Sequence, residues 1–233
     1  MVRGLRRIVL PTRARAKLFP DVRARLQAQL RFKLLLTVLL NLIFWMGYGW
    51  LGRHAYFPLH RLPFTWIDQA VPFQQQPWAW IYLSQFLFTS IMPWLLVKKE
   101  GVYRYAMGVA VMSAASFLIF LIFPVAAPRA VDLPADGSMA WIVLYDGPLN
   151  AFPSLHAGFL VYTGLLAWRM FGHVTPLVVA AGVLIWGGLI LYSTIATRQH
   201  YALDLVAGAT VGYLADWFAW RMSPRLKRTD LCR

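Results

Sequence analysis

The segment FKLLLTVLLNLIFWMGYGWL, residues 32–51, is the stretch that decides the fold. Its twenty residues contain one charged side chain, Lys33. About 20 apolar residues in a helix are enough to cross the hydrocarbon core of a bilayer. A chain in lipid must satisfy its backbone hydrogen bonds internally, so an isolated apolar run of this length predicts a transmembrane helix.

The same pattern recurs along the chain, and this predicts the fold class. Five further apolar windows of similar length follow, at residues 78–97, 103–125, 155–171, 177–195 and 202–221. Hydrophobic residues make up 59% of the sequence and charged residues only 14%. We therefore expect an all-α, polytopic membrane protein whose six transmembrane helices form one bundle, with a retained first helix rather than a cleaved signal.

The basic residues are distributed unequally between the loops. If both termini lie on one side, 19 of the 23 Lys and Arg fall on that side, and the opposite loops hold the other four. The positive-inside rule then places both termini in the cytoplasm. The net charge of +14 is explained by this topology, so we expect no nucleic-acid partner. The predicted organisation is a basic cytoplasmic segment at 1–31, a six-helix catalytic membrane domain at 32–221 and a basic cytoplasmic tail at 222–233.

Three smaller features complete this outline. The only cysteine, Cys232, excludes a disulfide framework and a thiolate zinc site. Val22, Leu26 and Leu30 recur at four-residue spacing among arginines, as in a helix on an anionic leaflet, although a solvated basic tail fits equally well. The G-x-x-x-G face of Gly208 and Gly212 predicts close packing against the glycine-rich fifth span, whose glycines are Gly182, Gly187 and Gly188.

The first chemical signal is the pair His200 and Asp204 at the predicted start of the sixth span. Residues four apart lie on one face of a helix, and the Asp204 side chain leans back toward His200. A carboxylate that accepts from one ring N–H fixes the tautomer and leaves the other nitrogen free as a nucleophile. The alternative for this spacing alone is an ion pair at a helix start without chemistry.

A second signal is AFPSLHAG, residues 151–158. Pro153 suits the first turn of a helix, where unpaired N–H groups form a natural phosphate site, and Ser154 adds a hydroxyl donor. His156 in that turn is placed to protonate a leaving alkoxide as a general acid. A lone interfacial histidine is the simpler alternative.

Two arginines complete the set. Arg129 and Arg198 lie in the outward loops three and five, and their planar guanidinium groups suit the oxygens of a phosphate. Surface arginines near lipid headgroups are the alternative. Because all six polar residues converge on one predicted membrane face, the combined pattern favours catalysis over each separate alternative.

These residues resemble the type 2 phosphatidic acid phosphatase superfamily, whose signatures are K-x6-R-P, P-S-G-H and S-R-x5-H-x3-D. The resemblance implies that His156 is the general acid, that His200 is the nucleophile with Asp204 as its partner, and that Ser154 contacts phosphate. The chain departs from the signatures in three places. Ile122 stands at the first lysine, Leu155 at the glycine and Thr194 at the third-motif arginine, for which Arg198 is the substitute.

The resemblance further implies a lipid-phosphate phosphatase that acts through a phosphohistidine at the outer face of a bacterial inner membrane. We expect no cofactor and no metal, because His54, His60 and His173 form no ligand cluster with carboxylates. The expected partners are a lipid phosphate and membrane lipids, with the oligomeric state open.

Three alternatives remain. The PSLH motif points to headgroup transferases that resemble inositol phosphorylceramide synthase. A non-catalytic lipid-binding or transport protein and a hydrolase with Ser154 as nucleophile are the others. The first outer loop contains Asp68, to which we assign no role.

Overall fold

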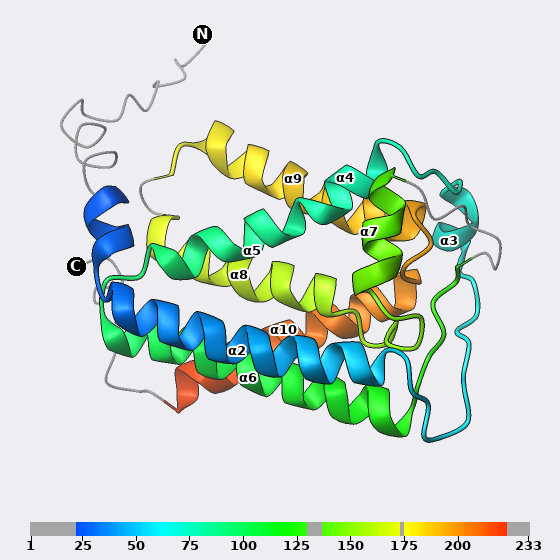
Figure 1. Cartoon of the computed structure of the whole chain (residues 1–233). Helices are drawn as coiled ribbons and strands as arrows, with labels where there is room; N and C mark the ends of the chain where they lie inside the picture. The colour runs from blue at the N-terminus through cyan, green and yellow to red at the C-terminus, as the bar shows by residue number, and fades with distance from the viewer. Residues whose placement is uncertain (1–21, 130–136, 173–174, 223–233) are drawn as a thin grey trace, which may run out of the picture.

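The computed structural model describes residues 22–129, 137–172 and 175–222, and within these ranges the chain is helical. Predictions for Cys232, His173 and the outer parts of both basic termini lie outside the described residues. Most helices run along the length of one bundle in alternating directions, as Figure 1 shows: α2 (Leu30–Leu51), α4 (Trp78–Leu83) with α5 (Gln85–Trp94), α6 (Lys99–Ile122), α8 (Leu155–Phe171), α9 (Leu177–Ala196) and α10 (Ala202–Arg221). Two short helices, α3 (Trp66–Ala70) and α7 (Gly137–Tyr145), lie at one end of the bundle.

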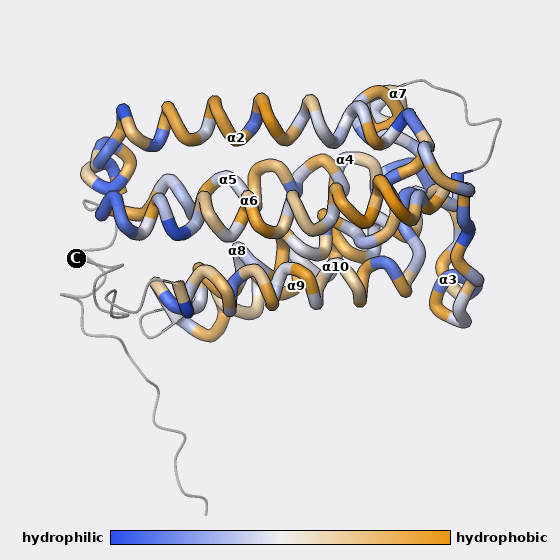
Figure 2. Tube along the Cα trace, turned by 90° about the horizontal axis from the view of Figure 1, so that it is seen from below, coloured by the Kyte–Doolittle hydropathy of each residue, from blue (hydrophilic) through white to orange (hydrophobic). Residues whose placement is uncertain are grey.

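The helices are apolar along their lengths and more polar toward their ends, as the hydropathy colouring in Figure 2 shows. Among the described residues, α2, α6 and α9 are long and apolar enough to cross a membrane. The other predicted spans differ from that standard. The second is divided at Ser84 into α4 and α5, the fourth has only 17 residues, and the sixth contains Asp204 and Asp216. A membrane-embedded helical bundle is therefore supported, whereas six spans and the sidedness of the termini stay predictions.

The closest helix contact joins α8 and α10. A Cβ atom on Gly208 would lie 1.9 Å from the carbonyl oxygen of Ser154, and one on Gly212 would lie 2.3 Å from that of Gly158. Only glycine permits this approach. The prediction that this face packs on the glycines of the fifth span is wrong, because a Cβ on any of those three glycines would have no atom within 4 Å.

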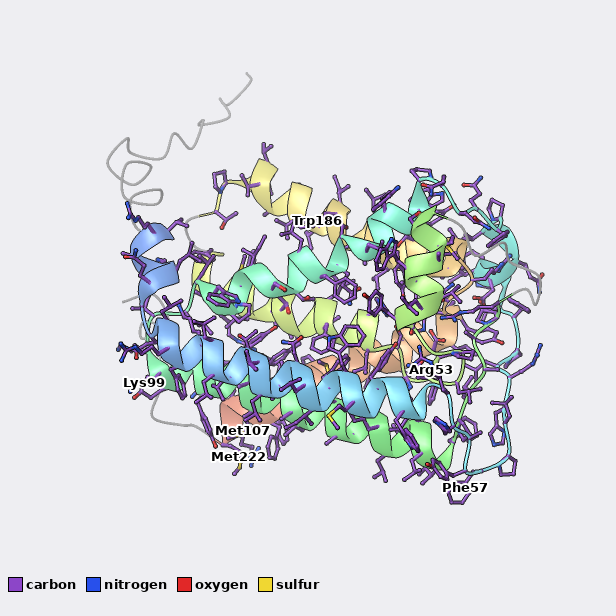
Figure 3. All side chains as sticks on the ribbon, viewed as in Figure 1. Arg53, Phe57, Lys99, Met107, Trp186 and Met222 are labelled. Atoms are coloured by element: carbon purple, nitrogen blue, oxygen red, sulfur yellow. The ribbon has the colours of Figure 1, made fainter. Side chains whose placement is uncertain are left out.

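The loops at the α3 and α7 end of the bundle are joined to one another. Val125 pairs in short parallel bridges with both His60 and Asn150, so the first outer loop, the end of α6 and the segment before α8 are in register. Figure 3 places Arg53 and Phe57 at this end and Lys99 at the opposite one. These loops form a cap over the N-terminal ends of α8 and α10, near which the two histidines lie.

Candidate active site

His200 lies in the tight turn between α9 and α10. Arg198 adopts a left-handed backbone conformation (φ 56°), and the amides of Gln199 and His200 both donate to the carbonyl of Thr194, at 2.9 and 3.2 Å. The sequence analysis placed His200 at the start of the sixth span. In the structure it lies two residues before the first residue of α10. Its side chain is buried, with 2% of its surface exposed.

Asp204 reaches His200 from the third position of α10. Its Oδ2 accepts from the amide of Tyr201 at 2.9 Å and lies 3.3 Å from Nδ1 of His200. The same Nδ1 is 3.1 Å from the carbonyl oxygen of Ala151. Because both neighbours of Nδ1 are acceptors, this nitrogen carries the proton, and Nε2 holds the lone pair in the neutral ring. The expected pairing is thus present, with the carboxylate on the side away from the free nitrogen.

The pKa of His200 reflects opposing effects. Burial disfavours the imidazolium, but the charge of Asp204 and its hydrogen bond, the more distant Asp146 and the Ala151 carbonyl favour it, and the net result is a pKa above the ordinary value of 6.5. Nucleophilic attack needs the neutral ring. The buried carboxylate of Asp204 therefore makes Nε2 of His200 a stronger base. A higher pH is needed before Nε2 is deprotonated and can attack.

His156 is the second residue of α8, two residues after the N-cap Ser154. Pro153 lies one residue before the cap, so the prediction that it occupies the first turn is wrong. The Ser154 hydroxyl accepts from the amide of Ala157 at 3.4 Å, and it keeps its own proton available for donation. Nδ1 of His156 lies 3.1 Å from Nε2 of His200, so the two imidazoles face each other. In the neutral pair, His156 donates and His200 accepts.

Asp146 is the residue that the sequence analysis missed. It follows the end of α7, is 6% exposed, and accepts hydrogen bonds from the hydroxyls of Tyr48 and Tyr82. One of its oxygens and one ring nitrogen of each histidine all lie within 4.8 Å of one another. The chain has only nine acidic residues, so an aspartate directly after an apolar segment and eight residues before Ser154 was an available signal.

The two predicted phosphate-binding arginines have different surroundings. Arg129 lies 3.6 Å from Asp146, and its buried Nε and Nη2 have no hydrogen-bond partner among the described residues. Arg198 donates instead to the carbonyl oxygens of Asp68 and Val71, at 2.9 and 3.1 Å. The structure therefore brings Arg129 to the histidines and holds the guanidinium of Arg198 on the loop around α3.

Asp68, to which no role was assigned, has a structural one. Its side chain is 1% exposed; one oxygen accepts from the amide of Ala202 at 2.8 Å and the other from the amide of Thr65 at 2.7 Å. Together with Arg198, it attaches the first outer loop to the turn that carries His200. No sequence motif signals these contacts, because the partners are 127 to 134 residues apart and mostly backbone atoms.

Asp146, His156 and His200 are also the residues that could offer ligands to a metal ion. The donor set fits a cation poorly. Both carboxylate oxygens already accept tyrosine hydroxyls, and the guanidinium of Arg129 places a positive charge 3.6 Å away. The same positive charge favours an anion such as phosphate.

An apolar cavity of about 220 Å³ extends from this cluster into the bundle. His156, Asp146 and Tyr48 line one end, and Lys33 and Trp94 line the other, with apolar side chains of α2, α5 and α6 between them. Residues 33 and 48 of α2 both line it, so it follows the helix for about 22 Å, at 1.5 Å per residue. The cavity has the length and the apolar lining for a hydrocarbon chain.

The comparison with protein families gives one finding. A family model described as the PAP2 superfamily matches residues 51–218, which include the two histidines, Ser154, Arg129, Asp146 and Asp204; Tyr48 and Lys33 lie before this range. Searches among curated proteins and among solved structures give no match.

Proposed function

Since this chain belongs to the PAP2 superfamily, we propose that it is a membrane lipid-phosphate phosphatase with His200 as its nucleophile. Membership supports phosphatase or phosphotransferase activity in general. The observation that carries the specific proposal is the facing pair of imidazoles 3.1 Å apart, one of which has a carboxylate on its far nitrogen. An arginine with unsatisfied buried donors lies beside this pair.

In the proposed first step, Nε2 of His200 attacks phosphorus while Arg129 and the Ser154 hydroxyl hold the phosphate oxygens. The bond to the lipid oxygen breaks, and His156 supplies the proton that this oxygen needs. Asp204 stabilises the positive charge that develops on His200. In the second step, His156 acts as a base and activates water, which releases phosphate from the phosphohistidine.

This chemistry requires the two rings to separate. In an in-line displacement the nucleophile and the leaving oxygen lie on opposite sides of phosphorus. Reacting atoms lie about 3 Å apart and a donated proton spans about 3 Å more, so the two ring nitrogens must be about 6 Å apart or farther in the reacting complex. The observed 3.1 Å is shorter than this, so phosphate that binds between the rings must move them apart from this closed arrangement.

The apolar cavity supports a lipid as the substrate. It begins at His156 and Asp146 and continues between α2, α5 and α6, so a phosphate at the histidines can keep its hydrocarbon chain inside the bundle. On the predicted topology the headgroup lies at the outer face of the membrane. A bacterial inner membrane is the proposed location.

A headgroup transferase is the second candidate function. His200 is 2% exposed and His156 is 9% exposed, and a site this enclosed excludes much of the water that would hydrolyse a phosphohistidine. A lipid alcohol that enters through the cavity would then be the acceptor. The same residues would carry out the first step in either case.

The test is a phosphate-release assay on purified protein in detergent with excess chelator. Phosphatidic acid, undecaprenyl diphosphate and phosphatidylglycerol phosphate are offered, and phosphatidylinositol with ceramide tests transfer. His200→Ala and His156→Ala are compared with wild type, and His54→Ala is the matched control because His54 is exposed and outside the cluster.

We expect phosphate release in chelator from one of these lipids, reduced by about 10³-fold or more in both active-site variants and unchanged in the control. Headgroup exchange without phosphate release would establish the transferase instead. Loss of activity in chelator that added metal restores would contradict the metal-independent mechanism. Full activity in His200→Ala would refute the assignment of the nucleophile.

A further inference from the structure

Asp146 carries a buried negative charge that helix stability does not explain. It follows Tyr145, the last residue of α7, and its amide donates to the carbonyl of Ile142 at 2.8 Å. This is the C-terminal end of a helix, where a carboxylate is disfavoured. The side chain is therefore held there by something other than capping.

The surroundings of Asp146 keep it ionised. Burial by itself raises the pKa of the carboxyl, but Arg129, the two histidines and the hydroxyl of Tyr48 outweigh burial, and the pKa lies below its ordinary value. The hydroxyl of Tyr82 donates to the same carboxylate. Two hydroxyl donors, from α2 and α4, and the guanidinium charge of Arg129 in the loop after α6 thus hold one anion beside the histidines.

The two histidines have different partners in the closed arrangement. Nδ1 of His200 has two acceptors of its own, Asp204 and the Ala151 carbonyl. Among the described residues, the hydrogen-bond partner of Nδ1 of His156 is Nε2 of His200, at 3.1 Å. When phosphate separates the rings and His156 turns its Nε2 toward the leaving oxygen, the buried Nδ1–H loses this acceptor and needs another. The carboxylate of Asp146 is the nearest anion, with an oxygen within 4.8 Å of a His156 ring nitrogen.

We propose that Asp146 is a positioning residue whose carboxylate accepts a hydrogen bond from Nδ1–H of His156 once substrate has parted the imidazoles, so that Nε2–H faces the leaving oxygen. This inference rests on the proposed function. The lone pair of His200 Nε2 forms the N–P bond, and the electrons of the breaking P–O bond go to the lipid oxygen. His156 is neutral in the closed pair, so a proton from the phosphate monoester monoanion first makes it an imidazolium. The departing oxygen then takes the Nε2 proton, and His156 becomes neutral again with its Nδ1–H donating to the carboxylate of Asp146.

The reaction would then use a carboxylate on each histidine, with opposite purposes. Asp204 makes His200 a better nucleophile, and Asp146 opposes the burial and the charge of His200 that lower the pKa of His156 to about 3 in the closed arrangement. The ring of Tyr82 packs 4.4 Å from that of His156 while its hydroxyl holds Asp146. One tyrosine thereby fixes the distance between the acid and its carboxylate.

The dependence on the leaving group tests this role. Octyl phosphate needs a proton on its departing oxygen, whereas 4-nitrophenyl phosphate releases a stable phenolate without one. Values of kcat/KM report the steps up to formation of the phosphohistidine. They are measured on full-length protein for wild type, Asp146→Asn, His156→Ala and the control Asp68→Asn, which changes another buried aspartate that contacts neither histidine.

We expect Asp146→Asn to lower kcat/KM by about 10²-fold for octyl phosphate and by less than tenfold for the nitrophenyl ester. His156→Ala should show the same selectivity. Asp68→Asn should affect both esters by the same factor. Asp146→Glu, which retains a carboxylate, should recover part of the octyl phosphate activity, and it also serves if Asp146→Asn does not fold.

Equal losses on both esters in Asp146→Asn, with selective loss in His156→Ala, would overturn the role of Asp146 and leave the proposed function intact. The same conclusion follows if Asp146→Glu is no better than Asp146→Asn on octyl phosphate. Equal losses in His156→Ala would instead refute the general-acid assignment and the inference with it. If wild type cleaves neither ester, the phosphatase proposal is refuted, and the role of Asp146 that rests on it is refuted as well.

Discussion

The substitution Gly208→Ala tests the link between helix packing and the site. An added Cβ would lie 1.9 Å from the carbonyl oxygen of Ser154, whereas real Cβ contacts stay beyond 3.0 Å. One of the two helices must therefore move by about 1 Å. The obstacle is backbone, which cannot rotate away, so we expect a cost of at least about 1–3 kcal/mol of stability.

The displacement would act on the catalytic geometry directly. Ser154 donates its amide to the carbonyl of Asp204 at 3.0 Å; Ser154 lies two residues before His156, and the Asp204 carboxylate lies 3.3 Å from Nδ1 of His200. A misplacement of about 1 Å at an active site can reduce the rate about 10²-fold. We therefore expect both a lower Tm and a fall in kcat/KM of about this size.

The assay combines thermal unfolding in detergent with phosphate release at a fixed lipid concentration. Gly187→Ala is the matched control, because its Cβ would meet no atom within 4 Å, and its activity should stay within twofold of wild type. If Gly208→Ala keeps the wild-type Tm and rate, the close contact between α8 and α10 is wrong. If both variants lose activity equally, the loss comes from helix propensity or expression and not from this contact.

Three further predictions follow from the charged residues. Arg129→Met should lower kcat/KM about 10- to 100-fold, since it removes charged donors to phosphate. Arg198→Met should lower Tm and change KM by less than threefold. The reverse pattern would identify Arg198 as the phosphate ligand. Because His200 must be neutral and its pKa is raised, kcat/KM should rise with pH along a limb whose midpoint is above 6.5, and Asp204→Asn should shift that limb to lower pH. Asp216→Ala, which breaks the buried ion pair with Arg169 away from the histidines, should lower Tm and leave the pH profile unchanged.

The helical class and most helix positions follow from hydrophobic length alone. The predicted span at 202–221 coincides with α10, and those at 155–171 and 177–195 differ from α8 and α9 by no more than one residue. The break at Ser84 and the short helix α7 were not predictable in this way, because an average over an apolar window does not register where a helix is interrupted. The partner of the Gly208 face was also missed, since G-x-x-x-G signals a close approach without identifying the neighbouring helix.

The site could be predicted where its residues act within one segment. Ser154 with His156, and His200 with Asp204, are close in sequence, and the structure brings the two segments together. Asp146 and Tyr82 could not be paired from sequence, because their contact depends on how α4 packs beside α7. Arg198 was wrongly assigned although it lies close to His200 in sequence. The left-handed turn at Arg198 directs its guanidinium to the loop around α3 and not toward the histidines.

The H-x-x-x-D spacing had two interpretations: an ion pair at a helix start, or a carboxylate that orients a nucleophilic histidine. Asp204 shows that both can be true of one residue. Its Oδ2 accepts the amide of Tyr201 and thereby stabilises the start of α10, and the same oxygen lies 3.3 Å from Nδ1 of His200. The helix start thus fixes the carboxylate before any substrate binds, so little reorganisation is needed as charge develops on the imidazole. Asp146 is held just as firmly, but by tyrosines and an arginine at the wrong end of a helix. The C-terminal end of a helix disfavours an anion. The presence of the Asp146 carboxylate there is therefore best explained by its neighbour, the second histidine, His156.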